Sequence, residues 1–173
     1  EATDTRGSRD LKARESDIEP LAYSTLLESM RQGHRRAHDE LTPGAVGCAL
    51  SHVGVSRLAL SRGLTRFAVF EDDAELPECV LSLMERATAE APTGWHCILL
   101  GWSGAPPAVP VGSLLQPVEK FWALHSYMLS AEGAQLMVRL NTPVRTHADH
   151  AMARGAARGE VRIYGVGPQE MRI

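Results

Sequence analysis

Three consecutive acidic residues, Glu71-Asp72-Asp73, have the residue types and the spacing best suited to chemistry in this sequence. They follow the apolar residues 67–70, which predict a strand buried on both faces. Ligands of open α/β sheets gather outside the carboxyl ends of the strands, where these acids would lie. Successive side chains of an extended segment point to opposite sides, so we expect Glu71 and Asp73 to face one side and Asp72 the other. Such a pair of carboxylates could hold a hard divalent cation and leave its other coordination positions for a diphosphate.

A second interpretation of the same triplet is structural. Two of the acids would then cap the turn that precedes Pro77, which is a common use of Asp. The tripeptide alone leaves both interpretations open, so the elements around it have to be considered.

A helix is predicted just before the acidic strand. Thr42 can accept a hydrogen bond at the helix start, and Pro43 at the first helical position lacks an amide that would otherwise have no partner. The apolar and small residues that follow predict a helix that packs on a sheet and runs to about Arg62, and Gly63 is suited to end it.

A second helix and a second strand follow the acids. Pro77 predicts the start of a helix that runs to about Ala91, and residues 97–100 predict another buried strand, which completes a β-α-β unit. The other expected elements are a helix over 18–30, a surface loop over 103–116, a strand over 124–129, a helix over 131–140 capped by Ser130, a loop over 146–150 and a strand over 161–164. Helices that alternate with strands predict an α/β fold, an αβα sandwich with a mostly parallel sheet.

The composition predicts one compact globular domain over residues 1–173. Of the 173 residues, 44% are hydrophobic and 23% are charged, and the net charge is −3. No like-charge block is long enough to indicate binding to nucleic acid or to a membrane surface. No apolar run reaches the ~18–20 residues of a transmembrane helix. The first residues lack the regions of a signal peptide, so we expect either a cytosolic chain or one whose leader was removed.

The cysteines indicate neither a zinc site nor a redox compartment. Cys48, Cys79 and Cys97 are about 31 and 18 residues apart, so no C-x-x-C pair is present, and three cysteines cannot all pair. We therefore predict no zinc site from the cysteines.

Two linked motifs give the sequence a resemblance to a known family. The segment L-T-P-G-A-V-G-C-A-L-S-H, residues 41–52, is followed after about fourteen residues by F-A-V-F-E-D-D-A, residues 67–74. This pair resembles glycosyltransferase family 25, whose members show an L-T-x-G-E-x-G-C-x-L-S-H segment before a strand that ends in E-D-D. The likeness covers nearly the whole chain, because further segments are similar to the family at residues 1–4, 94–101, 127–134 and 164–168.

The resemblance implies a GT-A-like fold and a nucleotide-sugar transferase. Such an enzyme moves a hexose, often galactose, from a UDP-sugar to a hydroxyl of a glycan or protein acceptor with Mn²⁺ or Mg²⁺. Carried over to this chain, the resemblance implies Glu71 and Asp73 as metal ligands, with Asp72 as the alternative to Glu71, and Ser51, His52 and Asp72 as nucleotide-sugar residues. It implies Asp149 as the catalytic base on the acceptor side, or as the group that accepts a hydrogen bond from a sugar hydroxyl. Two of these positions keep a structural alternative, because His52 could be a buried histidine and Asp149 an exposed loop acid.

The chain departs from the family pattern at three places. It begins after the family's first β-α unit, Ala45 stands where the family has glutamate, and His147-Ala148 stands where it has Pro-Val. Two classes of function therefore remain open: a metal-dependent hexosyltransferase, and a catalytically inactive domain that serves as a binding or structural subunit of a larger assembly. The second class would use the sheet edge left uncovered without the first unit, which a protein partner could occupy.

Overall fold

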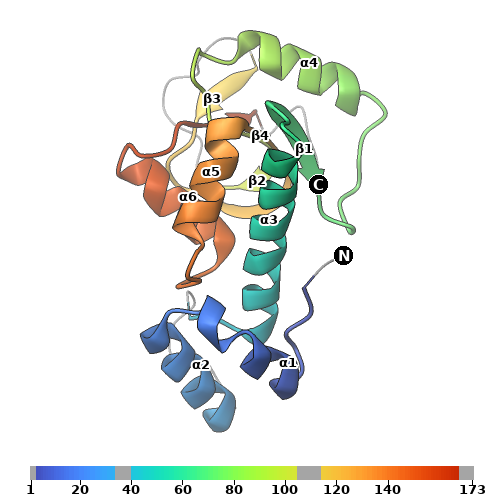
Figure 1. The fold of residues 1–173 in the computed structure, drawn as a ribbon. Coiled ribbons are helices and arrows are strands. Elements are labelled where there is room, and N and C mark those ends of the chain that lie inside the picture. The colour runs from blue at the N-terminus through green and yellow to red at the C-terminus, as the bar shows by residue number, and fades with distance from the viewer. Residues whose placement is uncertain (1–2, 34–39, 105–113, 168–173) are drawn as a thin grey trace.

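The computed structural model describes residues 3–33, 40–104 and 114–167, and within them a five-stranded sheet lies between helices (Figure 1). The helices are α1 (Ser8–Ala13), α2 (Pro20–Gln32), α3 (Pro43–Ser61), α4 (Val80–Glu90), α5 (Ala131–Leu140) and α6 (Ala148–Ala157), with a 3-10 turn η1 (Glu15–Asp17) after α1. The strands are β1 (Arg66–Phe70), β2 (Cys97–Ser103), β3 (Leu115–Pro117), β4 (Trp122–Ser130) and β5 (Ile163–Val166). The predicted α/β class is confirmed.

The sheet is mixed, so the prediction of a mostly parallel sheet was wrong. In the described parts of the chain the strand order is β1-β4-β2-β5-β3, and β2 with β5 is the one parallel pair. β1 and β2 run in the same direction, as the β-α-β unit requires, but β4 lies between them and is antiparallel to both. Because β4 comes much later in the chain than β1, the local pattern around β1 carries no information on this pairing.

β1 is an edge strand. Among the described residues it pairs with β4 alone, with Arg66 opposite Ser130 and Phe70 opposite Ser126. The strand is therefore partly exposed rather than buried on both faces, which corrects the expectation drawn from its apolar run. Directly after β1, the amide of Glu71 donates to the carbonyl oxygen of His125 on β4 at 2.8 Å, so the acidic segment starts beside the first half of β4.

The predicted helix starts beside the sheet are confirmed. At the start of α3, Thr42 Oγ1 accepts a hydrogen bond from the Ala45 amide at 3.1 Å, and Gly63 follows the helix with a φ of 68°. At the start of α5, Ser130 Oγ accepts from the Gly133 amide at 3.0 Å. These caps fix where each helix leaves the sheet.

Three other expectations need correction or lie partly outside the described residues. α4 begins at Val80 rather than at Pro77, because Pro77 is the first residue of a turn in which its carbonyl oxygen accepts from the Val80 amide at 3.0 Å. The expected loop over 146–150 contains the first turn of α6. Most of the predicted loop over 103–116 falls at positions 105–113, outside the described residues, and its end belongs to β3.

Two hydrophobic clusters fill the two faces of the sheet. The larger joins Leu99, Tyr127 and Leu129 of the sheet to residues of α1, α2, α3, α5 and α6. The smaller joins Ile98 and Met128, which alternate with them along the strands, to α4. Figure 1 shows α4 at the opposite end of the molecule from α1 and α2. Within the described residues, none of the helices has the length and apolar character that crossing a bilayer requires.

Candidate functional site

The acidic triplet divides into one inward carboxylate and two exposed ones. Asp72 and Asp73 lie in a turn that is closed by a hydrogen bond from the Ala74 amide to the Glu71 carbonyl oxygen at 3.1 Å. The turn of the structural interpretation is therefore present, but among the described residues no amide donates to the carboxylate of Asp72 or Asp73 to cap it. Glu71 differs from its neighbours, because its side chain is 28% exposed and points toward α3.

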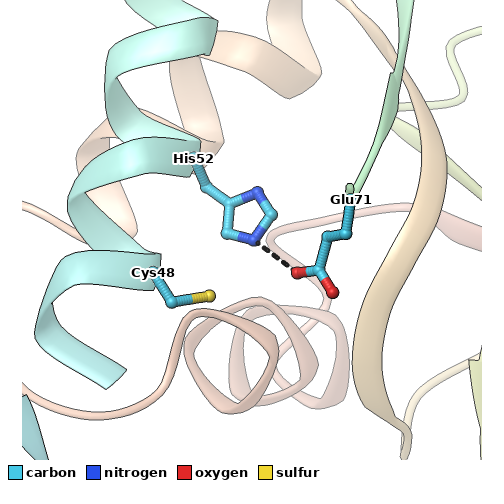
Figure 2. Close-up of side chains that lie close together, drawn as sticks. All are labelled: Cys48, His52 and Glu71. Carbon is cyan, nitrogen blue, oxygen red and sulfur yellow. Dashed lines mark ion pairs between the residues drawn. The ribbon is translucent and has the colours of Figure 1, made fainter. Parts of the chain in front are cut away.

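Glu71 lies between two imidazoles that come from different elements. Its Oε1 is 3.3 Å from Nε2 of His52 on α3, and its Oε2 is 3.2 Å from Nδ1 of His125 on β4. Figure 2 shows the first of these contacts, which spans the space between α3 and the end of β1. The carboxylate of Glu71, which follows β1, thus contacts side chains of both α3 and β4.

His52 is a buried histidine with a partner at each ring nitrogen. It is 5% exposed, and its Nδ1 lies 2.7 Å from the hydroxyl oxygen of Tyr127. Burial alone would lower the pKa of His52, but the hydrogen bonds to Cys48 and Glu71 outweigh burial and raise the pKa to about 9. The contact with His52 lowers the pKa of Glu71 against the opposing effect of burial, and His125 adds to the lowering. At neutral pH the two groups therefore form an imidazolium–carboxylate ion pair.

A cleft of about 710 Å³ lies between α3 and β1 and contains most of the predicted site. Its lining includes the residues expected to bind nucleotide-sugar and metal, together with the apolar outer face of α3: Ser51, His52, Glu71, Asp72, Asp73, Leu50, Val55 and Leu58. The structure therefore brings together five of the six predicted site residues. Asp149 is not among the described residues that line this cleft.

Ser51 has a structural partner on each side. Its hydroxyl donates to the Gly47 carbonyl oxygen at 2.9 Å and accepts from the Thr3 amide at 2.8 Å. A Cβ on Gly47 would overlap the Thr3 carbonyl and the Thr5 hydroxyl, so the N-terminal segment passes against α3 at this glycine. Ser51 therefore holds that segment at the rim of the cleft.

Asp149 lies in the first turn of α6 and binds backbone amides. Its Oδ2 accepts from the Ala123 amide at 2.8 Å, and its Oδ1 accepts from the His150 amide at 2.8 Å. Ala123 is in the left-handed region with a φ of 75°, two residues before His125 on β4. The carboxylate thus stabilises the start of β4, and Asp149 is partly buried in a helix rather than an exposed loop acid.

The described residues contain two groups of side chains that could hold a metal ion, and both include Glu71. One is Glu71, Asp73 and His125, and the other is Cys48, His52 and Glu71; in each group the ligand atoms lie within 4.8 Å of one another. Two carboxylates with an imidazole suit a hard or borderline ion such as Mg²⁺ or Mn²⁺. No sequence motif marks His125 as a site residue. Its position two residues before Tyr127 places both on one face of the predicted strand, but only the pairing of β4 with β1 brings it to Glu71.

The family comparison agrees with these elements. The family described as Glycosyltransferase family 25 (LPS biosynthesis protein) matches residues 14–104, which are more than half of the chain and include α3, the acidic triplet and β2. The chain belongs to glycosyltransferase family 25. No solved structure gives a significant match.

Relatives of this family-25 chain include both a named transferase and proteins named inactive. Human procollagen galactosyltransferase 2 is 32% identical over 124 residues, which are 65% of this chain and 20% of the relative. The probable inactive glycosyltransferase 25 family member 3 of Rattus norvegicus is 32% identical over 106 residues, 57% of this chain and 18% of the relative. The corresponding Bos taurus protein is 36% identical over 107 residues. The chain thus spans about a fifth of the length of these relatives.

Proposed function

We propose that this chain carries the metal and donor-binding part of a glycosyltransferase that moves a hexose, such as galactose, from a UDP-sugar to an acceptor hydroxyl. The observation that supports this most strongly is the convergence of Glu71, Asp73 and His125, of which Glu71 and Asp73 line the cleft. Family membership supports the reaction class, and the galactosyltransferase relative supports the sugar.

In this proposal Glu71 and Asp73 hold Mn²⁺ or Mg²⁺, and His125 is close enough to be a third ligand. The ion would neutralise charge that develops on the diphosphate leaving group. His52 carries its proton at neutral pH and holds Glu71 in place from the α3 side. Asp72 and the apolar face of α3 line the space in which the nucleotide would lie.

Calorimetric titration of UDP with and without Mn²⁺ tests the proposal directly. We expect UDP binding that requires Mn²⁺ and that is lost in Asp73→Asn, because this variant removes one ligand charge while keeping the shape of the side chain. Glu75→Gln is the matched control, since Glu75 is also an exposed acid of this segment but is not among the cleft residues. A dissociation constant of about 1 mM corresponds to a binding free energy of about −4 kcal/mol. A folded chain that shows no UDP binding even at this weak limit would contradict the proposal.

The second candidate function is a catalytically inactive subunit, and two observations favour it. Relatives named inactive match the chain as well as the galactosyltransferase does. In addition, both oxygens of Glu71 already contact imidazoles, so a metal ion would have to compete with them. The same titration separates the two functions, because the inactive subunit predicts no metal-dependent UDP binding.

A further inference from the structure

A thiol and an imidazole from α3 and a carboxylate from the end of β1 meet in the cleft. Cys48 and His52 are four residues apart on α3, so their side chains share one face of the helix. Figure 2 shows the Cys48 sulfur directed toward the His52–Glu71 pair, and the ligand atoms of all three residues lie within 4.8 Å of one another. We propose that Cys48, His52 and Glu71 form a binding site for a thiophilic divalent ion of the zinc class.

The chemistry of these ligands fits Zn²⁺ and not Mg²⁺. Thiolate and imidazole are the ligands zinc prefers, and a carboxylate completes a common three-residue set. Bonds of about 2.0–2.3 Å place the ligand atoms of a tetrahedral zinc ion roughly 3.3–3.8 Å apart. His52 Nε2 and Glu71 Oε1 already have that separation at 3.3 Å, and the sulfur has to approach by no more than roughly 1.5 Å. Zinc binds the thiolate form of cysteine and the neutral form of imidazole, so metal binding at such a site is coupled to proton release.

An independent contact prepares His52 for this role. Histidines that bind a metal through one ring nitrogen are oriented by a hydrogen bond at the other. Here Nδ1 of His52 lies 2.7 Å from the hydroxyl of Tyr127, which is fully buried in β4. This bond directs Nε2 toward Glu71 and Cys48. The cleft supplies the fourth coordination position, because all three residues line it and Cys48 is exposed.

The zinc site shares Glu71 with the group of Glu71, Asp73 and His125. A zinc ion bound to Glu71 would therefore weaken the hold on a hard cation next to it. The zinc site itself depends only on residues of this chain and not on the proposed glycosyltransferase function.

Protection of cysteines from alkylation tests the site in the unmodified chain. Mass spectrometry would follow iodoacetamide labelling of Cys48 and of Cys79, which is exposed and lies outside the group, so it serves as an internal control. With Zn²⁺ at roughly ten times its dissociation constant, we expect labelling of Cys48 to slow about tenfold while Cys79 is unaffected. Mg²⁺ should protect neither. Equal labelling of Cys48 with and without Zn²⁺ would overturn the proposal.

Variants identify the ligands and separate this site from the proposed donor site. The Co²⁺-loaded chain should show cobalt–thiolate absorption that Cys48→Ser lacks and Cys79→Ser retains. Protection of Cys48 by Zn²⁺ should be lost in His52→Gln and kept in Asp73→Asn, whereas Mn²⁺-dependent UDP binding should be lost in Asp73→Asn. Protection that persists in a folded His52→Gln chain would show that Cys48 binds zinc without this group and would overturn the site.

Discussion

The hydrogen bonds to Cys48 and to Glu71 raise the pKa of His52, and the contact with His52 lowers the pKa of Glu71. We predict that Glu71→Gln in the metal-free chain lowers the pKa of His52 from about 9 toward its ordinary value of 6.5, because the variant removes the carboxylate that favours the imidazolium. Titration of the His52 ring protons by NMR measures this change. Glu75→Gln serves as the control, and an unchanged His52 pKa in Glu71→Gln would contradict the prediction.

The pKa shifts of His52 and Glu71 determine how the stability of the fold depends on pH. The pKa of His52 is raised in the folded chain, so its contribution to stability is complete below 6.5 and is lost as the pH rises through about 9. The pKa of Glu71 is lowered, so its contribution is complete above its ordinary 4.5 and is lost as the pH falls through the folded value. The pair therefore stabilises the fold most between pH 4.5 and 6.5.

Asp149 allows a test between a structural and a catalytic role at one residue. Asp149→Ala leaves the amides of Ala123 and His150 without their acceptor, so we predict a loss of about 1.5–3 kcal/mol in the free energy of unfolding. Asp149→Asn keeps one acceptor oxygen and should lose less. Urea unfolding of both variants measures the difference.

The same two variants address the predicted base. If Asp149 acts as the base, Asn should lose transfer activity as completely as Ala while it remains better folded. If the loss of transfer activity in each variant is in proportion to its loss of stability, Asp149 has the structural role of stabilising the start of β4.

Site residues that belong to a sequence motif could be predicted from the sequence. Site residues that are brought into place by the pairing of distant strands could not. Glu71 and Asp73 follow an apolar strand, and His52 belongs to the L-S-H segment, so the sequence identifies each. His125 becomes part of the site only because β4 lies beside β1. Cysteine spacing does not identify Cys48, because its neighbours in the fold are a histidine one helical turn away and a glutamate on another element.

At the scale of elements, α3 positions the site and carries two glycines with opposite requirements. Gly47→Ala would place a methyl group against the backbone of Thr3, so we predict a loss of about 1–3 kcal/mol in stability. Gly54 lies on the same helix with open space at its Cβ position, so Gly54→Ala should gain about 0.5–1 kcal/mol from helix propensity. Thermal unfolding of the two variants measures both effects. If Gly47→Ala and Gly54→Ala change the stability equally, the contact between Gly47 and the N-terminal segment does not determine the effect of the substitution.

Elements were predictable where apolar periodicity or caps marked them. The starts of α3 and α5 follow from Thr42-Pro43 and Ser130, which act within one turn. α6 was missed because its buried face consists mainly of small residues, which give little hydrophobic signal although they recur at helical spacing: Ala148, Ala151, Met152, Gly155 and Ala156. The parallel sheet was wrongly predicted because local β-α-β order does not show that a later strand is inserted between the first two.

At the scale of the whole molecule, the two faces of the sheet are supported unequally. The larger hydrophobic cluster joins five helices to the sheet, whereas the smaller one has α4 as its helix and buries only Leu83 and Ala87 of it. α4 also follows the exposed turn that contains Asp72 and Asp73. The acidic segment is thus attached through Glu71 to the face with the larger cluster, and through the residues that follow to α4, which has fewer buried residues.

This inequality predicts that α4 opens without unfolding of the rest. Hydrogen exchange followed by mass spectrometry should show the amides of α4 exchanging through a local opening, with a lower free energy than the amides of α5 on the other face. α5 is the matched control because it has a similar length and buries Gly133, Ala134 and Met137, of which Ala134 and Met137 belong to the larger cluster. Denaturant well below the unfolding midpoint should leave exchange in α4 nearly unchanged and should speed exchange in α5, since local opening exposes little surface and global unfolding exposes much. If the amides of α4 and α5 exchange at the same rate and with the same denaturant dependence, the two faces of the sheet unfold as one unit. The segment with Asp72 and Asp73 would then open only together with the segment that contains Glu71.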